Sequence, residues 1–364
     1  MRIAVLWATL TGYMGAGLKA LASIPGNSLF VADNAGPEKQ APFDDALFAW
    51  IGENRFRHDG NPDSAELIRR LENFNPDVLY VASWNTAAYT KACTHFRGRA
   101  LRVSGMDNQW RGTLKQHIGV LTAPFFVRRF FDCMFVAGDR QRGFAERLGY
   151  NSDNIWQGLY CPDYDAYHAA LWPESSARPQ SFLFAGRLVE EKGVRILAEA
   201  YKQYREACTS SPWALNVAGG GPLESLLRGV PGVTVHGFVQ PDKLPALFQS
   251  SGAFVLPSIS ENWGVVIQEA AVAGMPLICS SECGATVHYL MDGYNGYVIE
   301  AGNVQSLQQA LQRMASASPE ELARMANASL ALAEQITPRR WAAYFLEKSS
   351  QARLSIKSET MVHK

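Results

Sequence analysis

The feature that most constrains the fold is a repeated unit in the second half of this 364-residue chain: a short apolar run, a turn and a helical segment. This strand–helix alternation predicts a parallel, doubly wound α/β sheet. Such sheets bind ligands beyond the carboxyl ends of their strands, where the next helices begin. The predicted strands cover residues 181–185, 214–218, 233–237, 253–256, 276–279 and 297–299.

The fourth of these strands runs into the segment PSISENWGVVIQE at 257–269, which carries two carboxylates with seven residues between them. Glu261 lies in the predicted loop, and Glu269 lies about a turn and a half inside a helix predicted to open near Gly264. Backbone N–H groups at Gly264 and Val265 favour anions or hydroxyl oxygens. Alternatively, Glu261 neighbours a helix N-cap and Glu269 is a solvated helix residue.

A second strand end, FAGRLVEEKG at 184–193, carries two cations. Arg187 stands at the strand tip and Lys192 stands just before the next predicted helix, an arrangement that favours a phosphate clamp. The alternative is a solvated loop of mixed charge, since Glu190 and Glu191 intervene. Hydroxyl-binding carboxylates beside a phosphate clamp indicate a nucleotide sugar as the ligand.

Five segments of the second half, in this order, resemble the retaining glycosyltransferases of family 4, which have the GT-B fold of two Rossmann-like domains facing across a cleft. The segments are GRLVEEKG, NVAGGGPLESLL, VTVHGFV, PSISENWGVVIQEAAVAGMPLICSSECGATVHYL and GYNGYVIEAGNVQSLQQAL, within residues 181–315. The resemblance implies transfer of a sugar from a nucleotide-diphosphate donor, without a metal or other cofactor, to a glycan or lipid-linked acceptor in cell-surface polysaccharide or lipopolysaccharide synthesis.

The resemblance also assigns roles to residues. Arg187 and Lys192 would hold the diphosphate and stabilise the leaving group, Glu261 would bind a sugar hydroxyl, and Glu269 would bind the ribose. The backbone at Phe238 and Val239 would read the base, and the turn at Gly220 would pass near the nucleotide, although a plain βα turn is equally compatible with that glycine. Further donor contacts are expected from Asn262, Trp263, Gly264 and Val265.

Three other classes of protein compete with this interpretation. A nucleotide-sugar epimerase of the same two-domain shape would need acid/base residues in its cleft and no acceptor site. A non-catalytic glycan-binding relative would not need Arg187 or Lys192. A nicotinamide dehydrogenase is disfavoured because Gly12, Gly15 and Gly17 do not have the spacing of the dinucleotide fingerprint.

The length fits two domains of middling size. The breaker-rich segment PESSARP at 173–179 predicts the boundary, with an acceptor-side domain at 1–172 and a nucleotide-sugar domain at 173–337. In this fold a helix at 338–350 packs back on the first domain. Residues 351–364 are polar and predict a flexible tail.

In the first half, a buried strand at 2–8 leads into a glycine-rich turn that includes Gly12 and Gly15. Such a turn lets backbone approach a ligand, and by resemblance it lies near the phosphates and the acceptor. A later predicted strand ends in GMDNQW, where Asp107 and Asn108 combine polar groups with an aromatic face suited to a sugar. Family members often have a histidine here, and we expect Asp107 or Asn108 to replace it. The alternative is an Asx-type turn over a packed Trp110.

Lys plus Arg equals Asp plus Glu at 34 each, so no global field attracts nucleic acid. Residues 91–147, however, hold eleven basic and four acidic residues, which indicates an anionic partner. Within them, residues 113–131 predict a helix interrupted by Pro124. The aromatic and cationic side chains there favour contact with a membrane surface, or core packing with snorkelling arginines. They are Phe125, Phe126, Phe130, Phe131, Arg128 and Arg129.

Six scattered cysteines favour neither a zinc site nor a disulfide framework. The first eight residues predict a strand rather than a signal peptide, and no apolar run has the length of a membrane span. Residues 35–62 predict a long irregular excursion with a helical piece at 44–51. The expected location is the cytoplasm, at the inner face of the membrane.

Overall fold

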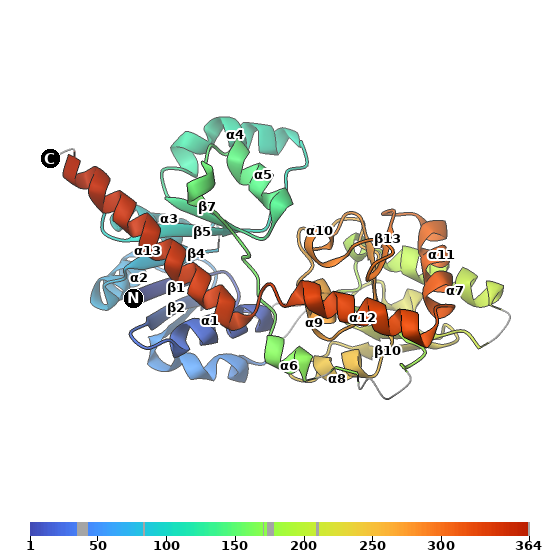
Figure 1. Ribbon diagram of the computed structural model, residues 1–364. Helices are drawn as coiled ribbons and strands as arrows, with labels where there is room; N and C mark the ends of the chain where they lie inside the picture. Colours follow the sequence, from blue (N-terminus) through green and yellow to red (C-terminus); the bar gives the residue numbers. More distant parts are fainter. Residues whose placement is uncertain (35–42, 83, 170, 173–177, 209–210, 363–364) are drawn as a thin grey trace. The chain divides into compact units, whose positions relative to one another are not determined.

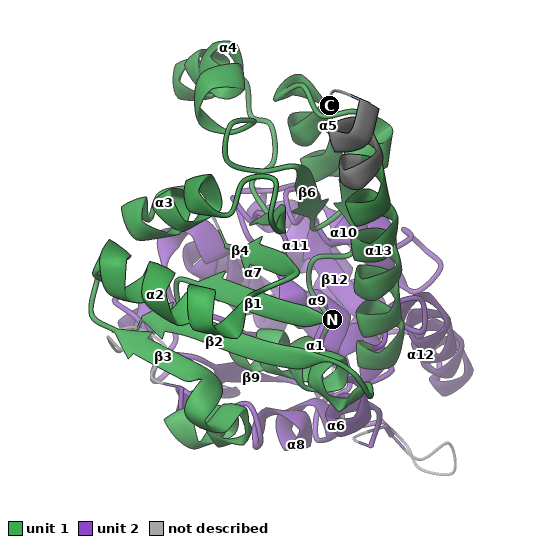
Figure 2. Cartoon of the chain, turned by 90° about the vertical axis from the view of Figure 1, so that its left-hand side faces the viewer, with its two compact units in different colours: residues 1–38, 45–161, 338–364 green, residues 39–44, 162–337 purple. Residues whose placement is uncertain are grey.

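The computed structural model describes residues 1–34, 43–82, 84–169, 171–172, 178–208 and 211–362, of which 356–362 are described by their backbone alone. The described residues fall into two compact units (Figure 2). The first holds 1–34, 45–161 and 338–362, and the second holds 43–44 and 162–337. The chain therefore enters the second unit after Cys161, earlier than the boundary predicted at 173–179, of which residues 173–177 lie outside the described residues.

The earlier boundary follows from the packing of helix α6 (Tyr164–His168). Its Tyr167 ring lies 5.2 Å from Phe248 in an edge-to-face contact, and Phe248 belongs to the second unit. Asp163 caps the helix by accepting a hydrogen bond from the Ala166 N–H. This short helix therefore belongs to the second unit.

The first unit is a parallel sheet with strand order β3-β2-β1-β4-β5-β6-β7 among the described residues. The order reverses between β1 and β4, which makes the sheet doubly wound. Strands β4, β5 and β6 are wholly buried, as a sheet covered on both faces requires. The bounds are β1 Arg2–Trp7, β2 Ser28–Asn34, β3 Arg55–His58, β4 Val78–Val81, β5 Leu101–Met106, β6 Cys133–Val136 and β7 Ile155–Gln157.

Helices cover both faces of this sheet (Figure 1). Their ends carry the expected capping groups: Asp63 accepts from the Ala65 N–H at the start of α2, and Thr113 and Gln116 form a capping box at the start of α4. The helices are α1 Gly12–Ser23, η1 Asp45–Asn54, α2 Ser64–Phe74, α3 Ala87–His95, α4 Leu114–Phe126, α5 Asp139–Arg147, η2 Ser152–Asn154 and α13 Pro338–Val362.

Two strands of the first unit were not predicted. Strand β2 directly follows α1, and the polar sequence RFRH of β3 lies inside the excursion predicted at 35–62. Because β3 is at the edge of the sheet, it lacks the continuous apolar run of a central strand. The helical piece predicted at 44–51 is η1, and residues 35–42 lie outside the described residues.

The glycine-rich segment is helical rather than a turn, since α1 already begins at Gly12 and includes Gly15. Gly17 of this segment serves helix packing. A Cβ on Gly17 would lie 3.0 Å from the Trp341 ring of α13, so the missing side chain lets the two helices approach. The turn predicted at Gly12 and Gly15 is therefore corrected to the first turns of helix α1.

Helix α13 packs along the first unit (Figure 2). Trp341 and Phe345 stack on one another, and Trp341 also stacks on Phe135 of β6. The indole Nε1 donates to the Leu159 carbonyl at 3.1 Å. The helix continues to Val362, past residue 351 where the sequence predicts a flexible tail, and Arg353 forms an ion pair with Asp77 at 2.7 Å.

The second unit is a parallel sheet with strand order β10-β9-β8-β11-β12-β13 among the described residues. The predicted α/β fold of two Rossmann-like sheets is confirmed. The predicted strands agree with the observed ones to within a residue at each end. They are β8 Ser181–Ala185, β9 Ala214–Ala218, β10 Val233–Gly237, β11 Ala253–Leu256, β12 Leu277–Ser280 and β13 Gly296–Ile299.

Helices also surround the second sheet (Figure 1). They are, besides α6, η3 Glu190–Lys192, α7 Val194–Ala207, η4 Glu224–Leu226, α8 Leu244–Gln249, α9 Val265–Val272, α10 Thr286–Tyr289, α11 Val304–Ala315 and α12 Pro319–Ala333. In the part of the chain that is described, no helix combines the length and the apolar character needed to cross a membrane.

Candidate functional site

Two loops meet at the switch point of the second sheet, where β8 and β11 lie side by side and the chain continues in opposite directions. The loop after β8 contacts the loop after β11 through backbone: the N–H groups of Ile259 and Ser260 donate to the Glu191 carbonyl at 2.9 and 3.2 Å. Gly193 has φ 69°, and a Cβ there would collide with the Pro257 carbonyl. A glycine is therefore required for the two loops to approach.

Lys192 and Glu261, one from each loop, form an ion pair. Their side chains are only 16% and 13% exposed. Burying both charges is tolerated because each neutralises the other. Glu261 is held in turn by a β-bridge to Cys283, in the loop after β12. The structure therefore brings together two of the four charged residues that the sequence assigned to the donor.

Arg187 is exposed at the tip of β8, directly after Gly186. The loop that carries it is held against the glycine-rich turn after β9, because Gly186 donates to the Ala218 carbonyl and Leu188 donates to the Gly220 carbonyl, both at 2.9 Å. A Cβ on Gly220 would meet only Glu224 at 4.0 Å. The turn is thus open on that side, where a ligand could approach the backbone.

Helix α9 opens at Gly264, which has φ 91° and acts as the N-cap. The N–H groups of Val265 and Val266 at its start have no acceptor within the helix, whereas the Ile267 N–H donates to the Gly264 carbonyl at 2.9 Å. Asn262 is half-buried beside them, but Trp263 is 3% exposed and its indole N–H donates to Gln268 at 2.9 Å. The Trp263 side chain belongs to the core, which leaves only its backbone for contact with a ligand.

Glu269, the fifth residue of α9, is mostly buried and accepts a hydrogen bond from the Tyr167 hydroxyl. The alternative of a solvated helix residue is therefore wrong. Burial raises the pKa of Glu269 to about 7; the Tyr167 hydrogen bond opposes this rise, and the charge of Asp163 adds to it. Near neutral pH this carboxyl is poised between its charged and neutral forms.

Phe238 and Val239 follow β10, as the sequence indicates, and both are half-buried. The ring of Phe238 makes an edge-to-face contact with Phe43, with ring centroids 5.7 Å apart. Gly237, just before them, has φ 71° and no atom within 4 Å of a built Cβ.

In the first unit, Asp107 lies at the carboxyl end of β5 and accepts a hydrogen bond from the Tyr160 hydroxyl at 3.0 Å. The Tyr160 ring packs edge-to-face on Tyr13 of α1, with centroids 5.1 Å apart. Tyr13, in the first turn of α1, and Asp107 thus both contact Tyr160. Burial, with the nearby Asp107 charge, raises the pKa of Tyr160 well above its usual value.

The remainder of the GMDNQW segment divides between exposed and packed residues. Asn108 is exposed. Trp110 packs edge-to-face on His117 of α4 and in a tilted contact on Phe144 of α5. The packed tryptophan of the alternative interpretation is therefore present, while Asp107 is engaged by a side chain far along the chain.

Residues 173–330 match the family model described as glycosyl transferases group 1. The matched residues lie within the second unit, and we refer to this part of the chain as the group 1 domain.

Known relatives align over a similar length of the chain. Glycogen synthase of Mycobacterium tuberculosis is 32% identical over 155 residues, which cover 40% of this chain and 37% of that protein. The D-rhamnosyltransferase WbpZ of Pseudomonas aeruginosa is 32% identical over 143 residues, covering 37% and 35%. The chain thus spans little more than a third of the length of the curated relatives it matches.

Solved glycosyltransferase structures share the GT-B fold of the whole chain. A glycosyltransferase from Rickettsia africae superposes with a TM-score of 0.75 at 14% identity, covering 96% of this chain and 98% of that one. The Anabaena protein HepE, solved in complex with UDP and glucose, gives a TM-score of 0.74 at 16% identity, covering 96% and 100%. At these identities the likeness concerns the fold.

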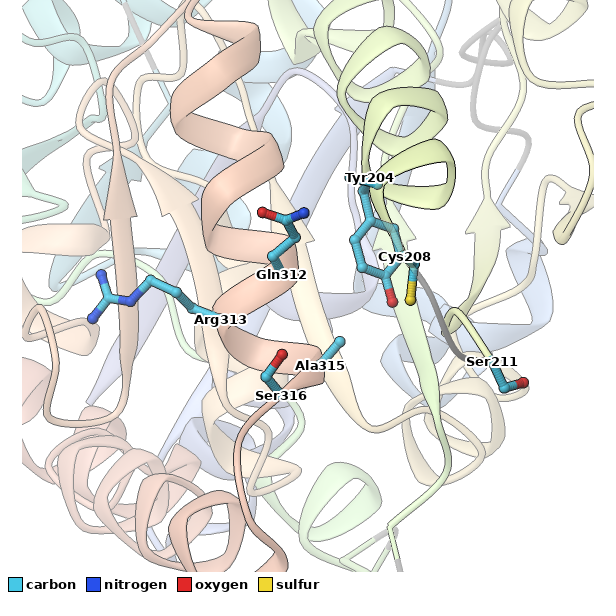
Figure 3. A pocket seen from close by; sticks show the side chains of 8 residues that line it. Tyr204, Cys208, Ser211, Gln312, Arg313, Ala315 and Ser316 are labelled. Carbon is cyan, nitrogen blue, oxygen red and sulfur yellow. The ribbon is translucent and has the colours of Figure 1, made fainter.

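A surface pocket of about 410 Å³ lies elsewhere on the group 1 domain, between the carboxyl ends of α7 and α11 (Figure 3). Because α7 leads into the start of β9, this pocket is at the amino-terminal edge of the sheet, opposite the Lys192–Glu261 pair. It is lined by Tyr204, Ala207, Cys208, Ser211, Gln312, Arg313, Ala315 and Ser316. We assign it no part in the candidate site.

Among the described residues, no three His, Cys, Asp or Glu side chains are grouped closely enough to bind a metal ion. The loop that supports the group 1 site also contains Cys283, whose thiol pKa burial raises to about 11. This buried thiol is consequently a neutral packing residue near Glu261 rather than a nucleophile.

Sequence reasoning missed Tyr167 of α6, whose hydroxyl forms the hydrogen bond to Glu269. The available signal was Asp163, a residue type that is favoured at helix N-caps. Asp163 caps the helix that carries Tyr167. The cap was visible in the sequence, but its distant partner was not.

Proposed function

We propose that the chain is a retaining glycosyltransferase of family 4 that moves a sugar from a nucleotide-diphosphate donor to a glycan or lipid-linked acceptor. The observation that carries this proposal is the Lys192–Glu261 pair at the switch point of the group 1 domain. In this proposal the cation binds phosphate and the carboxylate binds a sugar hydroxyl, at the position where doubly wound sheets bind their ligands.

In this proposal, four charged groups bind the diphosphate, the sugar and the ribose of the donor. Lys192 and the exposed Arg187 hold the diphosphate and stabilise the charge that develops on it. Glu261, freed in part from Lys192 as phosphate arrives, accepts a hydrogen bond from a sugar hydroxyl. Glu269, held by Tyr167, accepts hydrogen bonds from the ribose.

The proposed reaction needs neither a metal nor a protein nucleophile. The bond from the anomeric carbon to the diphosphate breaks, and the acceptor oxygen bonds to the same face of that carbon. The acceptor proton passes to the departing phosphate oxygen. This front-face course is proposed by analogy with family 4.

The acceptor binds the first unit in this proposal, near Asp107, Asn108 and the start of α1. Asp107 replaces the histidine common in the family. Its carboxylate, already oriented by Tyr160, can also accept a hydrogen bond from a sugar hydroxyl. The proposed setting is synthesis of cell-surface polysaccharide or lipopolysaccharide at the cytoplasmic face of a membrane.

The test is calorimetric titration of the full chain with a panel of nucleotide sugars, followed by product analysis of the donor that binds. We expect binding without added metal and slow hydrolysis of the donor alone. An altered sugar on an intact nucleotide would instead identify an epimerase. Binding of glycans with no binding of any nucleotide diphosphate would identify a non-catalytic relative.

A further inference from the structure

Helix α4 presents a stripe of large apolar side chains to solvent. All of its members are more than half exposed, and the first four are spaced by four, three and four residues, close to the 3.6 residues of a helical turn. We call this set the α4 stripe: Leu114, Ile118, Leu121, Phe125 and the adjoining Phe126. It is about 16 Å long at 1.5 Å per residue.

The opposite side of α4 fixes this orientation. Ala123 and Val127 are buried in the core of the first unit, and Val120 packs against that core. The Pro124 predicted to interrupt the helix lies inside its last turns. Phe131 is buried, so the aromatic set predicted for this region divides into a core part and the exposed stripe.

Cations surround the stripe without carboxylates among them. Arg111, Lys115, Arg128 and Arg129 are exposed, and no Asp or Glu occurs from Asn108 to Phe131. Within the described part of the chain, none of the four forms an ion pair. Large apolar side chains with unneutralised cations beside them fit an interface of acyl chains and anionic headgroups.

We propose that the α4 stripe docks the first unit on the surface of an anionic lipid bilayer, with the helix in the plane of the interface. A second copy of the chain is a poorer occupant, because two such faces would bring eight cations together without a carboxylate between them. Figures 1 and 2 both show α4 on the outside of its unit.

The docking surface adjoins the proposed acceptor side. The segment after Asp107 and Asn108 leads into α4, where Gln116 donates to the Gln109 carbonyl at 2.8 Å and accepts from the Arg111 N–H at 2.8 Å. In this respect the inference rests on the proposed function, because a lipid-linked acceptor would reach this loop from the bilayer.

Co-sedimentation with vesicles tests the proposal with the full chain. Vesicles of phosphatidylcholine and phosphatidylglycerol are compared with phosphatidylcholine alone, at low and high salt. We expect binding to the anionic vesicles that weakens with salt. Leu121→Ser/Phe125→Ser should reduce the partition coefficient more than about tenfold, given the apolar area lost. Arg128→Gln/Arg129→Gln should reduce it by about fivefold per cation.

Two matched controls keep the test specific. Leu354→Ser/Met291→Ser removes two apolar side chains that are more than half exposed elsewhere, and Lys19→Gln/Lys202→Gln removes two exposed cations elsewhere. Both should bind vesicles like the unaltered chain. The proposal is overturned if the stripe variants bind vesicles as well as the unaltered chain does, or if the chain does not bind anionic vesicles. If the chain binds no vesicles but forms a dimer that dissociates in the Leu121→Ser/Phe125→Ser variant, the stripe is instead a contact with a second copy. Calorimetric donor binding, read in parallel, tests the proposed function separately.

Discussion

The hydroxyl of Tyr167 hydrogen-bonds to the carboxylate of Glu269, joining the first helix of the second unit to the helix that follows β11. The two side chains are 102 positions apart in the numbering. This hydrogen bond favours the charged form of a carboxyl that burial pushes toward the neutral form. The protonation state of Glu269 near neutral pH thus depends on a residue outside its own helix.

Tyr167→Phe should change the pH dependence of donor binding. Loss of a hydrogen bond to a charged acceptor costs about 1.5–3 kcal/mol, so the pKa of Glu269 should rise by roughly one unit or more. If the ribose requires the carboxylate, nucleoside diphosphate binding at pH 7 should weaken by about fivefold and recover near pH 9. Calorimetry across this pH range measures the effect. Glu269→Gln should bind weakly at every pH, and an unchanged pH profile in Tyr167→Phe would count against the assignment.

Glu269→Gln should also change how stability depends on pH. The folded carboxyl has a pKa of about 7, above its ordinary value of 4.5, so between these values the folded chain holds a proton that the unfolded chain has lost. Folding stability from this group is therefore full below about pH 4.5 and falls as pH rises through 7, by at most about 3 kcal/mol. Urea unfolding at pH 5 and pH 8 should show this loss in the unaltered chain. The difference in unfolding free energy between pH 5 and pH 8 should be smaller in Glu269→Gln, and an equal difference in the two proteins would contradict the prediction.

Lys192→Ala should nearly abolish turnover and also destabilise the second unit. The change leaves the Glu261 carboxylate buried without its partner, which costs about 3–5 kcal/mol for buried pairs. Lys192→Ala/Glu261→Ala should lose less stability than the sum of the single variants, as measured by a denaturation double-mutant cycle. Lys202→Ala, which removes an exposed cation from α7, serves as the control. Normal rates in Lys192→Ala would refute its role at the phosphates.

Gly17→Ala and Gly119→Ala should act in opposite directions. A methyl group at Gly17 meets the Trp341 ring at 3.0 Å and should cost about 1–3 kcal/mol by overpacking. Gly119, inside α4, has open space at its Cβ position, and alanine there should stabilise the helix by about 0.5–1 kcal/mol. Thermal unfolding compares the two variants, and a neutral Gly17→Ala would show that α1 and α13 are less tightly packed than described.

The second sheet was predictable because its strands are continuous apolar runs between turns, a pattern that parallel strands covered on both faces require. The same reasoning missed β3, since an edge strand with the sequence RFRH has no apolar run. It also assigned the segment with Gly12 and Gly15 to a turn, because a glycine that admits a neighbouring helix, as Gly17 does, looks the same in sequence as one that bends the chain.

The positions of the charged site residues could be read from the order of the motifs, but their partners could not. Lys192 and Glu261 are 69 residues apart, and their pairing depends on two strands lying side by side. The exposure of Leu121 and Phe125 could not be predicted either, because these residues would have the same spacing in a helix that buries them against the core. Tertiary neighbours decide these cases, and local sequence does not record them.

The return of α13 to the first unit affects how the protein is made. Residues 162–337 form one uninterrupted stretch, whereas the first unit needs Trp341 and Phe345 to complete its aromatic core. During translation, the first unit therefore cannot complete its core until α13 has been made, whereas the second unit can fold before that. A polypeptide stopped after residue 337 should leave its amino-terminal half exposed to chaperones and proteases.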